Sequence, residues 1–129
     1  KMPLPQGEPD NNYDADAHRA AFKAFLTFLK GNLNGQTAIR VDQAWCTQAQ
    51  AVQGFGEFAL PDRIIREDEL AAELSALAQS VGVQPPATMM SRPVTQPYVL
   101  ADIYDAEIEK LTSDAYQRDY MIFGFDSWG

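Results

Sequence analysis

The sequence contains a single cysteine and a single histidine in 129 residues. With Cys46 alone, no disulfide can form within the chain, which fits a reducing compartment, and we expect a cytoplasmic protein. One His and one Cys cannot supply the ligand spacing of a zinc site, so we expect no metal. Nothing in the sequence places His18 beside the thiol as a catalytic base. We therefore expect His18 at the solvated surface and Cys46 as a small buried side chain.

Basic residues are also scarce, because ten Lys and Arg stand against eighteen Asp and Glu, a net charge of −8. Nucleic acids and anionic membranes both require a basic surface, so we expect neither as a partner. No run approaches the ~20 apolar residues of a membrane span, and no signal peptide opens the chain. The chain starts at Lys1 rather than Met, which is consistent with a piece processed or excised from something longer.

The glycine-rich loops that bind phosphates are missing as well. Neither G-x-x-x-x-G-K-[ST] nor G-x-G-x-x-G occurs. The stretch "GFGEF" at 54–58 has two glycines but lacks the strand and helix that should flank such a loop. The chain alone is therefore not expected to bind a nucleotide cofactor.

What the chain does contain is enough apolar sequence, 46%, for one domain with a core. Residues 1–13 hold three prolines and predict an extended lead-in, and 14–129 predict a single helical (sub)domain. Residues 83–98, with four prolines, predict a loop. "RIIR" at 63–66, bounded by Pro61 and Asp62, predicts a short strand. The expected fold class is mainly α with one short strand.

Three segments carry helical patterns. The first, 14–30, has Asp14 or Asp16 as its cap and Gly31 as its expected left-handed end. The second spans 68–81, and the third follows Asp105, its expected N-cap, and runs to about Tyr120. The apolar positions of the first two are Phe22, Phe25, Leu26 and Leu29, then Leu70, Leu74, Leu77 and Val81. Residues 32–58 are less regular, and Gly54 and Gly56 are expected to break any long helix there.

Polar residues stand out in three places. In "VDQAWCTQ" (41–48), Asp42, Trp45 and Gln48 could share one side and hold a polar ligand, although a capped turn with a core Trp explains them more simply. Before the second helix, Arg66 and Glu67 suit a structural role in which the acid satisfies helix N-terminal amides.

Asp119 interrupts the apolar stripe of the last helix and is therefore expected to point inward. Its partner should be an arginine or several N–H groups, and we expect Arg40, Arg63 or Arg66 to fill this role. Such a pairing would tie the last helix to the middle of the domain. We expect a scaffold role for Asp119 rather than a catalytic one.

These places occur in the order found in a known family. The chain resembles the C-terminal part of bacterial sulfotransferases that use 3′-phosphoadenosine 5′-phosphosulfate (PAPS), the carbohydrate and nodulation-factor group. A family D-x-H-W-x-P-Q corresponds to 42–48. A v-x-R-x-E-x-L element that leads into a Leu-rich helix corresponds to "RIIREDEL" at 63–70, with Arg66 or Arg63, Glu67 and Leu70. The final signature, Y-x-x-D-[YF]-x-x-F-G-[YF], is matched by Tyr116, Asp119, Tyr120, Phe123, Gly124 and Phe125.

The resemblance implies the C-terminal helical portion of an α/β P-loop-like sulfotransferase fold. The family moves a sulfuryl group from PAPS to a hydroxyl or amine acceptor. On this basis Asp42, Trp45 and Gln48 are expected at the acceptor side, while Arg66, Glu67, Asp119 and Gly124 are expected to be structural. The implied partner is an N-terminal sulfotransferase segment or another chain.

The match departs from the family in two ways. Ala44 and Thr47 replace the usual His and Pro, so any role of that His is lost. The PAPS-binding motifs of the family lie upstream of the region resembled, and this chain alone is expected to be inactive and to bind no PAPS. The alternative is a non-catalytic helical domain, derived from that fold, that binds a protein partner. Both alternatives predict exposed apolar surface.

Overall fold

The computed structural model describes residues 13–83 and 98–128. Over these residues the protein is helical and contains no strand. The expectations for residues 1–12, and for most of the 83–98 loop, fall outside the described ranges. Across the described residues, no helix combines the length and the apolar character that crossing a membrane requires.

The first helix, α1 (Ala15–Leu33), confirms the predicted segment and its cap. The Asp14 side chain accepts a hydrogen bond from the Ala17 amide at 2.8 Å. The predicted end at Gly31 is wrong, because the helix runs on to Leu33. The left-handed residue is Gly35, at φ 71°. The extra turn carries Asn32, which is 1% exposed and bonded to the chain that follows.

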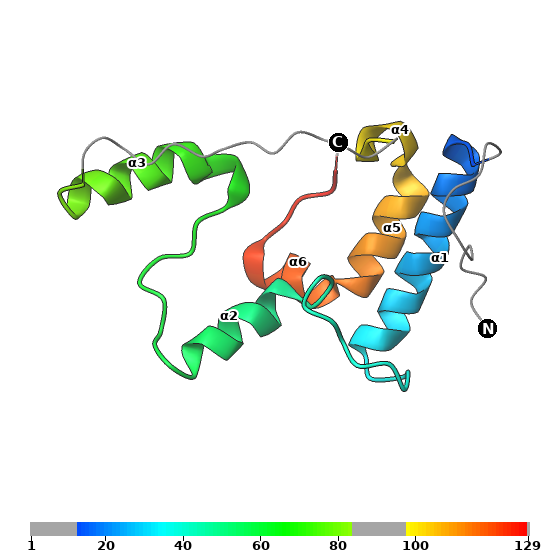
Figure 1. Ribbon diagram of the computed structural model, residues 1–129, viewed down its shortest axis with the longest axis horizontal. Helices are drawn as coiled ribbons and strands as arrows, with labels where there is room; N and C mark the ends of the chain where they lie inside the picture. Colours follow the sequence, from blue (N-terminus) through cyan, green and yellow to red (C-terminus); the bar gives the residue numbers. More distant parts are fainter. Residues whose placement is uncertain (1–12, 84–97, 129) are drawn as a thin grey trace.

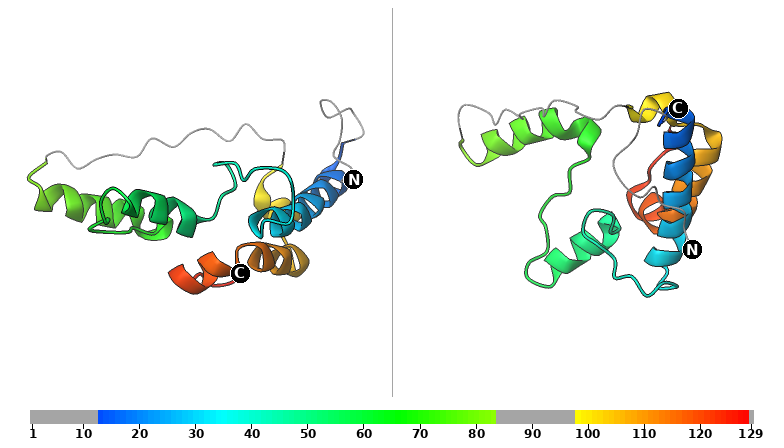
Figure 2. Two further views of the ribbon diagram at one scale, coloured as in Figure 1. Left: turned by 90° about the horizontal axis from the view of Figure 1, so that it is seen from below. Right: turned by 45° about the vertical axis from the view of Figure 1, so that its right-hand side comes forward.

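The core lies between α1 and α5 (Ala106–Ala115), which run side by side in Figures 1 and 2. Leu26 and Leu29 of α1 meet Ile108 of α5, and Ile108 is fully buried. The short helix α4 (Leu100–Ile103) also packs against α1. Burying such side chains stabilises the fold by roughly 1.5–3 kcal/mol each.

Ion pairs follow the exposed edge of the α1–α5 contact. Arg19 pairs with both Asp105 and Glu107, Lys23 pairs with Glu107 at 2.5 Å, and Lys30 pairs with Asp114 at 3.0 Å. Amide hydrogen bonds, first from Ile108, and the Arg19 guanidinium lower the pKa of Asp105. Lys23 and then Arg19 lower the pKa of Glu107, and Lys30 with Lys110 lowers that of Asp114.

These depressed pKa values make stability fall in acid. A carboxylate whose pKa is lower in the folded chain contributes stability above its ordinary pKa and loses it as the pH falls through the folded value. We expect the thermal midpoint, followed by circular dichroism, to drop progressively below about pH 4.5. Replacing Arg19 and Lys23 together by glutamine should flatten this drop. An identical drop in that double variant would contradict the assignment.

Past α1, the chain leaves the core. It forms α2 (Gln48–Gly56), an extended stretch, the 3₁₀ turn η1 (Glu67–Glu69) and α3 (Leu70–Ser80). The predicted second helix is confirmed as η1 and α3 together. Among the described elements, α2 packs on α6 (Gln117–Phe123) and α3 packs only on η1, so α3 stands apart in Figure 1.

In this region one sequence prediction is wrong and one helix was not predicted. Residues 63–66 are extended but form no strand, because no other described segment is extended beside them to complete a ladder. The α2 helix was not predicted, and it contains both Gly54 and Gly56. Thr47 and Gln50 form a reciprocal capping box at its start, which offsets the weak helix propensity of glycine.

The last predicted helix is present but divided. Asp105 caps α5 through the amides of Glu107 and Ile108, as predicted. The helix stops at Ala115, and α6 begins at Gln117 after a break at Tyr116. Gly124, in the left-handed conformation at φ 63°, ends α6. The break turns α6 toward α2.

Candidate functional site

The Asp119 carboxylate sits against the N-terminus of α2. It is 3% exposed, and its two oxygens accept hydrogen bonds from the backbone amides of Gln48 at 2.7 Å and Ala49 at 2.9 Å. The first amides of a helix lack partners within the helix and carry the positive end of its dipole, so they favour an anion. Asp119 therefore points inward, as predicted, and ties α6 to α2.

The expected arginine partner of Asp119 is wrong. Arg40 is exposed, and Arg63 Nη1 pairs with Glu73 Oε2 at 3.0 Å. Arg66 reaches the other end of α6 instead. Over the residues that the structure describes, the Asp119 carboxylate is held by backbone amides and forms no ion pair. A buried carboxylate needs either an arginine or several N–H groups as partners, and Asp119 has the N–H groups.

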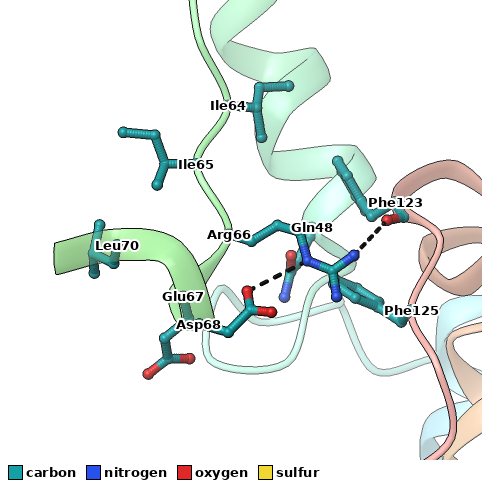
Figure 3. Close-up of a pocket in the computed structure, with 9 residues that line it drawn as sticks. All are labelled: Gln48, Ile64, Ile65, Arg66, Glu67, Asp68, Leu70, Phe123 and Phe125. Carbon is teal, nitrogen blue, oxygen red and sulfur yellow. Dashed lines mark hydrogen bonds and ion pairs between the residues drawn. The ribbon is translucent and has the colours of Figure 1, made fainter. Parts of the chain in front are cut away.

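Arg66 holds the C-terminal end of α6 (Figure 3). Its Nη1 donates to the carbonyl oxygens of Phe123 at 3.3 Å and Gly124 at 3.4 Å. The guanidinium carbon lies 5.4 Å from the centre of the Phe125 ring, within cation–π range. Nε lies 3.4 Å from Asp68 Oδ1, close enough for an ion pair but without hydrogen-bond geometry. A cation at a helix C-terminus complements the dipole.

Glu67 does not cap the helix that it begins. No side-chain hydrogen bond caps η1, and Glu67 is exposed. The predicted capping by this acid is therefore wrong. The Glu67 side chain lies in the first helical turn, where the helix dipole favours a negative charge. Because the side chain is exposed, solvent and salt screen this favourable interaction.

The residues expected at the acceptor side are only partly brought together. Trp45 and Gln48 line one hollow of about 310 Å³, while Asp42 does not line it. Asp42 Oδ1 accepts from the Ala44 amide at 2.9 Å, which makes a local turn. The Gln48 side chain is exposed, and only its backbone amide is used by Asp119.

Trp45 is anchored inside the fold. Its Nε1 donates to Asn32 Oδ1 at 3.0 Å, and its ring meets Phe25 and Phe28 edge to face. The Tyr116 hydroxyl donates to the Trp45 carbonyl at 3.0 Å. The indole donor is therefore occupied, and the capped turn with a core Trp describes this segment.

A larger hollow, of about 620 Å³, lies between η1 and α6. Figure 3 shows Arg66 pointing across it from the extended stretch toward Phe123 and Phe125. Gln48, from the start of α2, lies on the same side. Ile64, Ile65 and Leu70 complete an apolar wall. The Arg66 guanidinium shares the hollow with the carboxylates of Glu67 and Asp68, and this mixture of apolar and charged groups suits contact with protein or with a polar ligand.

The structure also contains a polar cluster that the sequence analysis missed. Glu109 accepts hydrogen bonds from the Tyr104 hydroxyl at 2.5 Å and the Tyr120 hydroxyl at 3.1 Å. Burial and this carboxylate raise the pKa of both phenols, so both stay neutral. The signal was weak because the three residues lie in different elements, and only the five-residue step from Tyr104 to Glu109 is local.

His18 and Cys46 do not form a site. His18 is half-buried rather than solvated, because its Nδ1 lies 2.9 Å from the Tyr13 hydroxyl and its ring 5.2 Å from that of Tyr98. Cys46 is also half-buried, and its thiol donates to the Gln43 carbonyl. In the described part of the chain, no three His, Cys, Asp or Glu side chains gather as metal ligands.

Gly124 allows a direct test of the turn that ends α6. Replacing it by alanine should lower the free energy of unfolding by about 1–2 kcal/mol, because a Cβ disfavours the left-handed conformation. Gly54→Ala in α2 is the matched control, since a Cβ there meets nothing within 4 Å, and it should gain about 0.5–1 kcal/mol. Urea unfolding measures both. Equal effects would contradict the conformational argument.

The site thus consists of three segments distant in sequence, 42–48, 63–70 and 116–125, that meet around Asp119 and Arg66. Comparisons of the chain with protein families, with curated proteins and with solved structures find no match.

Proposed function

We propose that this chain forms the C-terminal, acceptor-side part of a sulfotransferase-like protein that transfers a sulfuryl group from PAPS to a hydroxyl or amine. The observation that carries the proposal is the meeting of the three segments on which the resemblance rests. Asp119 of the last motif bonds the amide of Gln48, 71 residues earlier, in the middle motif. Arg66 of the second motif bonds the carbonyl of Gly124, 58 residues later, in the last.

This meeting supports the proposal because a chance likeness gives no reason for the motifs to touch. Three short matches scattered along a chain could fall anywhere on its surface. Here the matched Asp, Arg and Gly instead hold one joint between α2, η1 and α6. The role that the resemblance implies for Asp119 and Gly124 is structural, and their contacts are of that kind.

Exposed apolar side chains give further support. Phe58 is 92% exposed and Leu60 is 82% exposed, and Phe55 and Ile64 are also open. These residues lie on α2 and the stretch after it, where the described elements leave them uncovered. A self-sufficient domain rarely exposes such a patch, so an N-terminal segment or another chain is the expected cover.

The same patch favours a second candidate, a non-catalytic helical domain that binds a protein partner. The two candidates differ in what lies beyond this chain. A sulfotransferase requires a PAPS-binding part, covalently attached or associated, whereas the interaction domain requires only a partner. In the first case Trp45 and Gln48, which line one hollow, face the acceptor, and Asp42 shapes the turn before them. The internal bond of the Trp45 indole leaves only its ring for that contact.

The reading frame and the intact mass of the natural protein test the proposal first. An upstream phosphate loop is expected, and the protein that carries it should transfer labelled sulfuryl from PAPS. Adenosine 3′,5′-bisphosphate should raise its melting temperature and leave that of the present chain unchanged. A natural start near Lys1, or a complete protein that binds no PAPS, would favour the interaction domain and overturn the enzyme.

A matched pair of variants tests the acceptor side in the complete protein. Gln48→Ala leaves the backbone amide that bonds Asp119 and removes only the exposed side chain. It should raise the KM for the acceptor about threefold to tenfold, the effect of one lost hydrogen bond. Gln53→Ala, also exposed on α2, is the control and should change nothing. Equal KM values would remove Gln48 from the site.

A further inference from the structure

A third hollow, of about 490 Å³, opens among α4, α5 and the segment that follows Gly124. Aromatic rings form much of its lining. Tyr104 and Trp128 lie with their ring centres 5.0 Å apart and their planes tilted by 34°. Tyr120 meets Phe125 edge to face at 6.0 Å. Several ring systems around one open volume are the usual surroundings of an organic cation.

The charges around this hollow are predominantly negative. Asp68, Glu109 and Asp126 line it together with one basic residue, Arg66. Arg66 lies against Asp68 in an ion pair. Among the described residues, no ion pair joins Glu109 or Asp126 to a basic side chain. The two tyrosines stay neutral because burial and Glu109 raise the pKa of both phenols. The hollow therefore carries a negative excess.

A purely structural role explains only part of this arrangement. The bonds from Tyr104 and Tyr120 to Glu109 link the end of α4, α5 and α6, and they account for the position of Glu109. They do not account for Trp128, which is 58% exposed yet held against Tyr104. They also leave the volume beside the rings open. A large aromatic ring half in water beside an open hollow is suited to contact with a ligand.

We propose that this hollow binds a small organic cation, an ammonium group with carbon substituents. The rings of Tyr104 and Trp128 contact the carbon substituents of the ammonium group, over which its positive charge is distributed. The carboxylates of Glu109 and Asp126 supply the opposite charge. An anion is repelled by the carboxylates, and a bare metal ion gains nothing from ring carbons. This site is independent of the proposed sulfotransferase activity, because it uses none of the acceptor-side residues.

The test uses calorimetric titration of the whole chain with three probes that share a hydroxyethyl group. Choline is the quaternary cation, ethanolamine the primary one, and dimethylbutanol the uncharged isostere of choline. We expect at least one of the cations to bind, about threefold to thirtyfold more tightly than the isostere. The stronger of the two cations identifies the preferred substitution on nitrogen. The proposal would be overturned if neither cation bound more tightly than the isostere, or if none of the probes bound.

Two variants and a control locate the binding. Trp128→Leu should lower the affinity for the cation about tenfold, as expected for the loss of one ring. Asp126→Asn should lower it about threefold, as expected for the loss of one partly screened charge. Asp62→Asn makes the same change of net charge outside the hollow and should leave the affinity unchanged. Circular dichroism checks that each variant is folded. Equal effects of the Asp126 and Asp62 variants would mean that net charge alone attracts the cation.

Discussion

Replacing Asp119 by alanine is expected to lower the free energy of unfolding by about 2–5 kcal/mol. The reason is that the Gln48 and Ala49 amides lose their acceptor while Ala49 stays buried, and each unsatisfied buried donor costs about 1–3 kcal/mol. The α2 helix also loses the anion at its N-terminus. Urea unfolding followed by circular dichroism measures the change, and loss of α2 should reduce the helical signal before the main transition.

Two companions make this result specific. Asp119→Asn keeps one acceptor and removes the charge, so its loss should be intermediate. Asp62→Ala removes an equal charge from an exposed position and should change stability by no more than about 0.5 kcal/mol. If the Asp119 and Asp62 variants were equally stable, the tie between α6 and α2 would contribute nothing.

The contrast between Asp119 and its partner indicates what the sequence could reveal. The inward direction of Asp119 follows from its place in the apolar stripe of the last helix, which is local information. Its partners are backbone amides, which every residue possesses and which therefore leave no mark in the sequence. An arginine was the partner that a side-chain pattern could suggest. The actual tie depended on a helix, α2, that was not predicted.

The missed helix had a signal that two glycines concealed. Thr47 and Gln50 have the spacing of a capping box, and both halves of that box are formed. The predicted strand failed for the opposite reason, because a β-branched pair at Ile64 and Ile65 describes local preference only. A strand requires a neighbour, and local preference cannot supply one.

The site was predictable in its segments and not in its contacts. Helices α1, α3 and α5 follow from periodicity and caps, since their apolar stripes and the Asp14 and Asp105 caps are all local. The Glu109 cluster and the contact of Arg66 with the end of α6 join residues 11 and 57 positions apart. Such pairs depend on how α5 and α6 diverge at Tyr116, which no short pattern specifies.

Trp45→Ala is expected to lower the free energy of unfolding by about 3–5 kcal/mol, the usual loss for a large ring removed from a core. Trp45→Phe should lower it by about 1–3 kcal/mol, because the ring contacts with Phe25 and Phe28 remain while Asn32 Oδ1 loses its donor. Asn32 is 1% exposed, so water cannot readily replace the indole.

The Trp45 result matters because this side chain joins α1 to the start of α2. Asn32 also donates to the Ile39 carbonyl at 2.6 Å, so this one side chain holds the chain between the two helices at Ile39 and at Trp45. Trp128→Phe is the control, since Trp128 is mostly exposed and its loss should change stability by no more than about 0.5 kcal/mol.

Chemical denaturation monitored by circular dichroism compares all three variants. If Trp45→Phe lowered stability as much as Trp45→Ala, the ring contacts with Phe25 and Phe28 would contribute nothing. If Trp45→Phe were as stable as Trp128→Phe, the hydrogen bond to Asn32 would contribute nothing. A stability of Trp45→Phe between these two limits would mean that both the ring contacts and the Asn32 bond stabilise the start of α2. Trp45 then helps to hold the first amides of α2 where Asp119 accepts their hydrogen bonds.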